Sequence, residues 1–87
     1  MKVIILENGT WFDLDGATEK WLDPTKYHEI IRTKHGSFVL HNLPIPGSLS
    51  LRVEYETMSK VAAAYYLNKW GYDVPKMLLL AIAQSEV

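Results

Sequence analysis

The chain has 87 residues, enough for a single domain over residues 1–87. Its composition, 48% hydrophobic and 11% aromatic, excludes a disordered chain, and its formal net charge of −1 gives no global field that would attract nucleic acid or anionic lipid. Cysteine is absent, which excludes disulfides, thiol nucleophiles and thiolate metal sites and suits a reducing cytoplasm.

Two apolar runs at the N-terminus predict a β-hairpin. Val3–Leu6 and Trp11–Leu14 flank Asn8-Gly9, a pair that favours a two-residue type I′ turn. This turn would pair Leu6 with Trp11 and Ile5 with Phe12. The predicted core face then holds Val3, Ile5, Phe12 and Leu14, and the mixed face holds Ile4, Leu6, Trp11 and Asp13. Because the first strand is apolar on both faces, we expect it inside the sheet or covered on its second side.

The segment that follows is polar and turn-rich. Asp15-Gly16 indicates a turn, and the acidic DLDG piece echoes part of a calcium loop without the preceding helix that the motif requires. We interpret it as a solvated turn. The next residues, 17–23, are predicted to be irregular or a short strand, because Pro24 disfavours helical geometry at Asp23.

Residues 27–42 predict a second hairpin with its loop at His35-Gly36. A two-residue loop would pair Thr33 with Phe38 and Ile31 with Leu40, which makes Ile31, Phe38 and Leu40 the core face. A loop of three or four residues would shift these partners.

The opposite face of this hairpin is the candidate ligand site. With the two-residue loop it carries His28, Arg32 and His41, a set that offers hydrogen bonds and bidentate carboxylate or phosphate binding. Trp11 is a further candidate, because it lies on the mixed face of the first hairpin. No third metal ligand is identifiable, so we predict no metal site, no cofactor and no catalytic residue.

The C-terminal half predicts a loop, a strand and two helices. Leu43–Leu51 is rich in proline and glycine, and Arg52–Thr57 alternates as a last strand. Ser59 is placed to cap a helix over Val61–Trp70 that Gly71 ends. Asp73 and Pro75 predict the start of a second helix that runs to about Ala83.

The two helices are more apolar than one sheet-packing face requires. Their excess predicts a homodimer; the alternative is that the helices bury both apolar stripes against each other and the sheet. The predicted interface comprises Tyr65, Tyr66, Met77, Leu78, Leu79, Leu80 and Ile82. A helix-turn-helix is disfavoured, because the second helix offers a nucleic acid only Lys76 before apolar groups. The apolar run 77–83 is far shorter than the ~20 residues that span a bilayer, so we expect a soluble protein without a membrane partner.

Three pieces of the chain resemble a group of small uncharacterised bacterial proteins, some of which are found on mobile elements. These pieces are WFDLD at Trp11–Asp15, IIRTKHGSFVLHN at Ile30–Asn42 and MSKVAAAYYLNKWGY at Met58–Tyr72. The resemblance implies a hairpin, paired strands around a glycine turn and a glycine-ended helix. It carries no activity, cofactor or site residue.

Together these patterns predict an α+β fold, an antiparallel meander of four to five strands with two C-terminal helices packed on one face. The expected function is that of a small non-enzymatic binding or regulatory protein that acts as a homodimer, with an unidentified protein or small molecule as a further partner. The alternative is a small enzyme or ligand-binding domain with a pocket between sheet and helices, using His28, Arg32 and His41.

Overall fold

The computed structural model describes residues 1–47 and 53–87 and has the predicted α+β fold. A four-stranded antiparallel sheet runs in the order β3-β4-β5-β6, with strands Glu19–Leu22, His28–Arg32, Phe38–Asn42 and Tyr55–Met58. Strands β1 (Val3–Ile5) and β2 (Trp11–Asp13) form a separate two-stranded sheet, followed by a 3₁₀ turn over Leu14–Gly16. Helices α1 (Lys60–Lys69) and α2 (Lys76–Ser85) end the chain.

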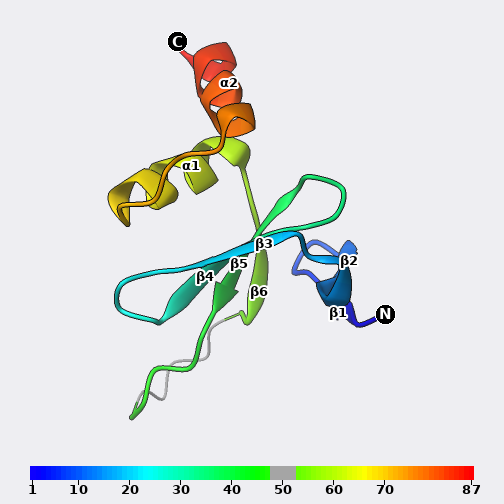
Figure 1. Ribbon diagram of the computed structural model, residues 1–87. Helices are drawn as coiled ribbons and strands as arrows, with labels where there is room; N and C mark the ends of the chain where they lie inside the picture. The colour runs from blue at the N-terminus through cyan, green and yellow to red at the C-terminus, as the bar shows by residue number, and fades with distance from the viewer. Residues whose placement is uncertain (48–52) are drawn as a thin grey trace.

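Two hydrophobic cores lie on opposite faces of the four-stranded sheet. On one face, Ile30 and Phe38 pack with α1, and Leu78 of α2 completes this helix-side core. On the other face, Ile31 and Val39 pack with the β1–β2 hairpin. Figure 1 shows the resulting order of layers, with the helices on one side of the sheet and the N-terminal hairpin on the other. The first strand is therefore outside the meander, and covers it instead of extending it.

The register of the first hairpin differs by one residue from the prediction. Ile5 pairs with Trp11 and Ile4 with Phe12, and the Gly9 amide donates to the Leu6 carbonyl across a three-residue loop. Only the glycine of the Asn-Gly pair has positive φ, at 86°, whereas a type I′ turn needs it at both residues. The loop is therefore a type I turn followed by a left-handed glycine.

This shift reverses the predicted faces of β1. Val3 and Ile5, predicted as core, are exposed, while Leu6 and Phe12 are buried. Side chains alternate along a strand. A shift of one residue in the pairing therefore moves every side chain of one strand to the other face of the sheet.

The second hairpin has the same kind of loop and the same shift. Arg32 pairs with Phe38 and Ile31 with Val39, and the Gly36 amide donates to the Thr33 carbonyl. Gly36 has φ 81°. The predicted core face of Ile31, Phe38 and Leu40 is thus divided, with Ile31 facing the N-terminal hairpin and the other two facing the helices.

The helix boundaries follow the predicted capping signals at both ends of α1 but not at the start of α2. The Ser59 hydroxyl accepts the Ala62 amide at 3.1 Å at the start of α1. Gly71 adopts φ 89° after the helix, and the amides of Gly71 and Tyr72 donate to the carbonyls of Asn68 and Leu67, as in a Schellman motif. The prediction of Asp73 as the second cap is wrong, because Pro75 precedes α2 and makes no side-chain cap.

The remaining predicted segments are the Asp15-Gly16 turn, residues 17–23 and the last strand with the loop before it. The ambiguous stretch at 17–23 contains β3, and the Asp15-Gly16 turn is part of the 3₁₀ turn. The last strand begins at Tyr55; Arg52 and the end of the predicted Leu43–Leu51 loop lie outside the described residues. Within residues 1–47 and 53–87, neither helix has the length and apolar character needed to cross a membrane.

Candidate functional site

The turn between β3 and β4 positions the most distinctive polar cluster. The Asp23 amide donates to the His28 carbonyl at 2.9 Å, and the Lys26 amide donates to the Asp23 carbonyl at 3.0 Å. Pro24 pre-sets the φ that the second position of such a turn requires. Lys26 adopts φ 66°, a left-handed conformation that is uncommon outside glycine. The turn thereby brings the Asp23 and His28 side chains together across the end of the hairpin.

The Asp23 carboxylate is buried and is held by hydrogen bonds. One oxygen accepts from the Thr25 hydroxyl at 2.8 Å and the Tyr27 amide at 3.1 Å, and the other lies 2.7 Å from His28 Nδ1. Burial alone would raise the pKa of Asp23, but these hydrogen bonds and one from the Lys26 amide more than offset it, so the net pKa is below its usual value. Asp23 is therefore an ionised carboxylate inside the fold.

The contact with Asp23 fixes the orientation of the His28 ring. An ionised carboxylate can only accept hydrogen bonds, so Nδ1 carries the proton that faces it. In the neutral ring, Nε2 is then the nitrogen that keeps its lone pair. This arrangement is the one by which carboxylates orient histidines in binding and catalytic sites.

His28 and Asp23 line a cavity of about 480 Å³ between the β3–β4 turn and α1. Pro24 and Thr25 line the same side, Leu40 comes from β5, and the opposite wall is formed by Tyr66, Lys69 and Trp70. A volume of this size falls in the range of small-molecule sites, roughly 300–1,000 Å³, which are also mostly apolar with a few placed polar groups.

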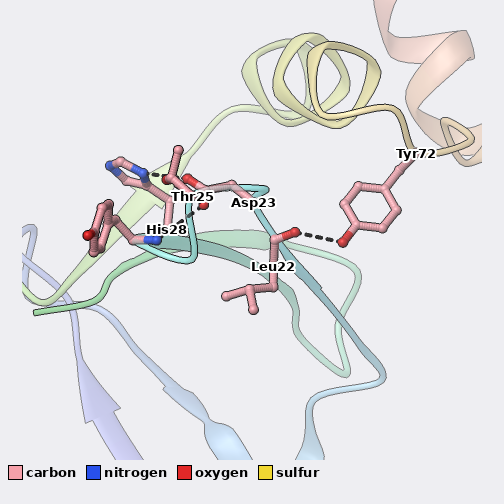
Figure 2. A network of polar contacts seen from close by, with 6 residues as sticks. Leu22, Asp23, Thr25, His28 and Tyr72 are labelled. Carbon is pink, nitrogen blue, oxygen red and sulfur yellow. Dashed lines mark hydrogen bonds and ion pairs between the residues drawn. The ribbon is translucent and has the colours of Figure 1, made fainter. Parts of the chain in front are cut away.

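Tyr72 ties the helices to the strand that leads into this site. Its hydroxyl donates to the Leu22 carbonyl at 2.6 Å, one residue before Asp23. Figure 2 shows this contact beside the Asp23, Thr25 and His28 cluster. The cavity walls are thus held together by a bond between the α1–α2 linker and β3.

The three residues of the predicted ligand face do not form one site. His28 pairs with Asn42 and Glu29 pairs with His41, so the two histidines lie on opposite faces of the sheet. Arg32 shares a face with His28 but lies at the other end of β4. Its guanidinium pairs with Glu19 on β3 at 2.8 Å.

His41 has a separate, enclosed environment. Its ring stacks on Tyr55 with centroids 4.2 Å apart, and Glu29 and Glu54 lie 3.4 and 3.5 Å from its two nitrogens. Burial, then the charges of Glu54 and Glu29, raise the pKa of Tyr55. Both ring nitrogens of His41 face carboxylates of the same chain. We therefore interpret His41 as a structural residue and not as part of a ligand site.

Trp11 lies away from the His28 cavity. It is exposed, pairs with Ile5 and lines a second cavity of about 370 Å³ near the loops of both hairpins. Besides His28, seven described residues line the His28 cavity, and none of them was predicted as a ligand-site residue, although Tyr66 was predicted at the dimer interface: Asp23, Pro24, Thr25, Leu40, Tyr66, Lys69 and Trp70. The available signal was the Asp-Pro-Thr turn, because Asp in turns commonly accepts hydrogen bonds from nearby backbone amides.

Among the described residues, no group of three histidine, aspartate or glutamate side chains is placed to hold a metal ion. No protein-family model, curated protein or solved structure matches this chain.

Proposed function

We propose that this protein is a small binding protein whose ligand site is the His28 cavity. The observation that carries the proposal is the short bond between His28 and the buried Asp23 at the wall of a mostly apolar cavity. Keeping an ionised carboxylate inside a fold is costly unless hydrogen bonds compensate it. A cluster of this kind in a cleft is a recognised indicator of a functional site.

Binding is favoured over catalysis by the way the cluster uses its hydrogen bonds. The Thr25 hydroxyl donates to Asp23, and Asp23 also accepts backbone amides of its own turn. These contacts orient His28 and close the turn. Thr25, the one hydroxyl of this cluster, is thereby held by a carboxylate and not by the His28 ring that would have to activate it as a nucleophile.

A nuclear magnetic resonance titration with mixtures of small aromatic fragments tests this proposal. Fragments that occupy the cavity are expected to shift the amides of residues 23–28 and 66–70. The variant His28→Asn should weaken these shifts, and His35→Asn, a change at a histidine outside the cavity, should leave them intact. Shifts spread over the molecule, or none at these amides, would contradict the proposal.

We also propose that the protein acts as a homodimer through α2. One side of this helix is used within the chain, where Leu78 is fully buried and Met77 is half-buried, so these two residues are removed from the predicted interface. The other side exposes Leu79, Leu80 and Ile82, with exposed fractions of 52%, 57% and 41%. Tyr65 and Tyr66 of α1 are also exposed.

A second copy of the chain is the proposed occupant of this α2 face. The face has no charged residue between Met77 and Ser85, so it has no electrostatic preference for a charged partner. Two such helices related by a two-fold axis would each cover the other's leucines, as an isologous interface requires. Contiguous exposed apolar side chains of this kind mark interaction surfaces in small proteins.

Light scattering on the wild type should give twice the chain mass. The double variant Leu79→Glu, Ile82→Glu should give a monomer with unchanged helix content, because it adds charge only to the exposed side. The control Lys20→Glu changes charge at an exposed residue of β3, away from α2, and should stay dimeric. A wild type that is monomeric at high micromolar concentration would overturn the homodimer proposal.

A further inference from the structure

The cavity that we assign to a ligand has an uneven distribution of charge. Among the described residues, the acidic and basic side chains that line it are Asp23, His28 and Lys69. Tyr66 adds a phenol. Because the one N–H of the neutral His28 ring faces Asp23, the balance between Asp23 and Lys69 decides which ligands the cavity accepts.

Asp23 contributes little to this balance, because its oxygens are already occupied. One oxygen accepts from Thr25 and the Tyr27 amide, and the other faces His28 Nδ1. Asp23 is also buried, at 5% exposed. A cationic ligand would therefore meet a carboxylate whose acceptor sites are mostly used by its own turn, and it would also meet the positive charge of Lys69.

Lys69 carries the exposed positive charge of the site. It is exposed, and its ammonium lies 6.0 Å from the centroid of the Tyr65 ring, a distance at which the attraction to an aromatic face is weak. Its side chain also lines the cavity. A lysine on a long flexible stem can turn its ammonium from this ring toward an anion in the cavity at small cost.

The remaining walls are flat and apolar. Trp70, Tyr66 and Leu40 line the cavity, and the centroids of the Trp70 and Tyr66 rings lie 5.9 Å apart. Aromatic side chains stack on planar groups and add energy beyond the area they bury. The body of a fitting ligand is thus apolar and planar.

We propose that the cavity binds small planar organic acids, with the acid group directed to the Lys69 ammonium and the planar body placed against Leu40 and the Trp70 and Tyr66 rings. This inference rests on the function proposed above, because it names the ligand class of the same cavity.

Isothermal titration with a matched pair of probes, biphenyl-4-carboxylate and biphenyl-4-carboxamide, tests this assignment. The probes share size and planarity and differ in charge. We expect the carboxylate to bind about five- to tenfold more tightly, the range that a charge-assisted hydrogen bond supplies when partly exposed. The variant Lys69→Met, which keeps the apolar stem, should remove this preference. The control Lys60→Met, at the other end of α1, should keep it.

The outcomes separate the ligand class from the ligand site. Equal affinities for the two probes, with amide shifts at residues 23–28 and 66–70, would overturn the acid preference and leave the binding function standing. Binding of neither probe at these residues would overturn both. A carboxylate preference that survives Lys69→Met would also contradict the assignment, because it would place the acid group elsewhere.

Discussion

Asp23 shows how a single residue organises the candidate site. Its carboxylate accepts hydrogen bonds from the Thr25 hydroxyl, the Tyr27 amide and the His28 ring. His28 was predicted as a site residue from its place on a strand, whereas its partner was not. The distance between them depends on the shape of the turn at Pro24, which hydrophobic patterns do not encode.

The variant Asp23→Asn should lose stability and lose part of its pH dependence. The pKa of Asp23 is lowered in the folded state, so its contribution is present above the unfolded pKa of about 4 and is lost as pH falls through the folded value. We expect a loss of about 1–3 kcal/mol at pH 7, as for hydrogen bonds to a charged group. Urea unfolding at pH 7 and pH 3 measures both effects. Equal losses at the two pH values would contradict an ionised Asp23, and Asp73→Asn, at an exposed position, serves as the control.

At the scale of elements, both hairpins were predicted in place and both were one residue out of register. The sequence indicated the strands and the glycines correctly. It did not distinguish a two-residue loop from a three-residue loop. Asn8-Gly9 and His35-Gly36 fit a two-residue loop with positive φ at both residues, and they equally fit a three-residue loop with positive φ at the glycine alone, which is the one observed. This single ambiguity accounts for the misplaced faces of Val3, Ile5 and His41.

Replacing Gly9 measures the geometry of the first loop. Gly9 has φ 86°, and an added Cβ would meet nothing within 4 Å, so the cost of a side chain there is backbone strain alone. We expect Gly9→Val to destabilise the protein by about 1–3 kcal/mol. Gly9→Asn should cost clearly less, since asparagine tolerates the left-handed region. Chemical denaturation of the two variants compares them, and equal stability would contradict a left-handed loop position.

Glu7 in the same loop fastens the N-terminal hairpin to the edge of the main sheet. Both its carboxylate oxygens lie 3.0 Å from the Thr57 amide, and the Thr57 hydroxyl also donates to it. These bonds, the side-chain one first, lower the pKa of Glu7. The carboxylate occupies a donor on an edge strand that another chain could otherwise pair with.

We expect Glu7→Gln to speed hydrogen exchange at the Thr57 amide. In the wild type, the same amide should exchange relatively faster, after correction for intrinsic rates, as pH falls through the lowered pKa of Glu7, because the protonated acid is a weaker acceptor. The control Glu86→Gln, beyond the end of α2, should leave Thr57 unchanged. Identical protection of Thr57 in the wild type and Glu7→Gln would show that the contact does not hold the edge.

At the scale of the whole molecule, the hydrophobic and capping patterns of the sequence predicted the fold class. They did not predict the order in which hairpin, sheet and helices are layered. Alternating strands, a capped helix and a terminal glycine predicted an α+β meander with C-terminal helices. They did not indicate that β4 and β5 would be buried on both faces. Ile30 and Ile31 are adjacent and both fully buried, one under α1 and the other under the N-terminal hairpin. Two adjacent isoleucines are typical of a strand that is covered on both faces. The sequence predicted such burial for β1, whereas the same pattern in β4 was not recognised.

The two cores should differ in how much of the molecule depends on each. The helix-side core joins the sheet to α1 and α2 through Leu67 and Leu78, whereas the other core holds only a two-stranded hairpin against the sheet through Leu6 and Phe12. A two-stranded hairpin alone is at best marginally stable in water. Its opening is therefore expected to be a local event of lower free energy than global unfolding.

Paired truncations test this difference. Leu67→Ala should lower the global free energy of unfolding by about 2–5 kcal/mol, because it leaves a cavity in the core that joins sheet and helices. Phe12→Ala should instead release the hairpin, so that hydrogen exchange accelerates in β1 and β2 while the amides of β4, β5 and α1 keep most of their protection. Native-state exchange followed by nuclear magnetic resonance resolves the two patterns. If Phe12→Ala accelerated exchange equally in β4 and α1, the hairpin would be an integral part of one cooperative unit, and the view of it as a detachable layer would be wrong.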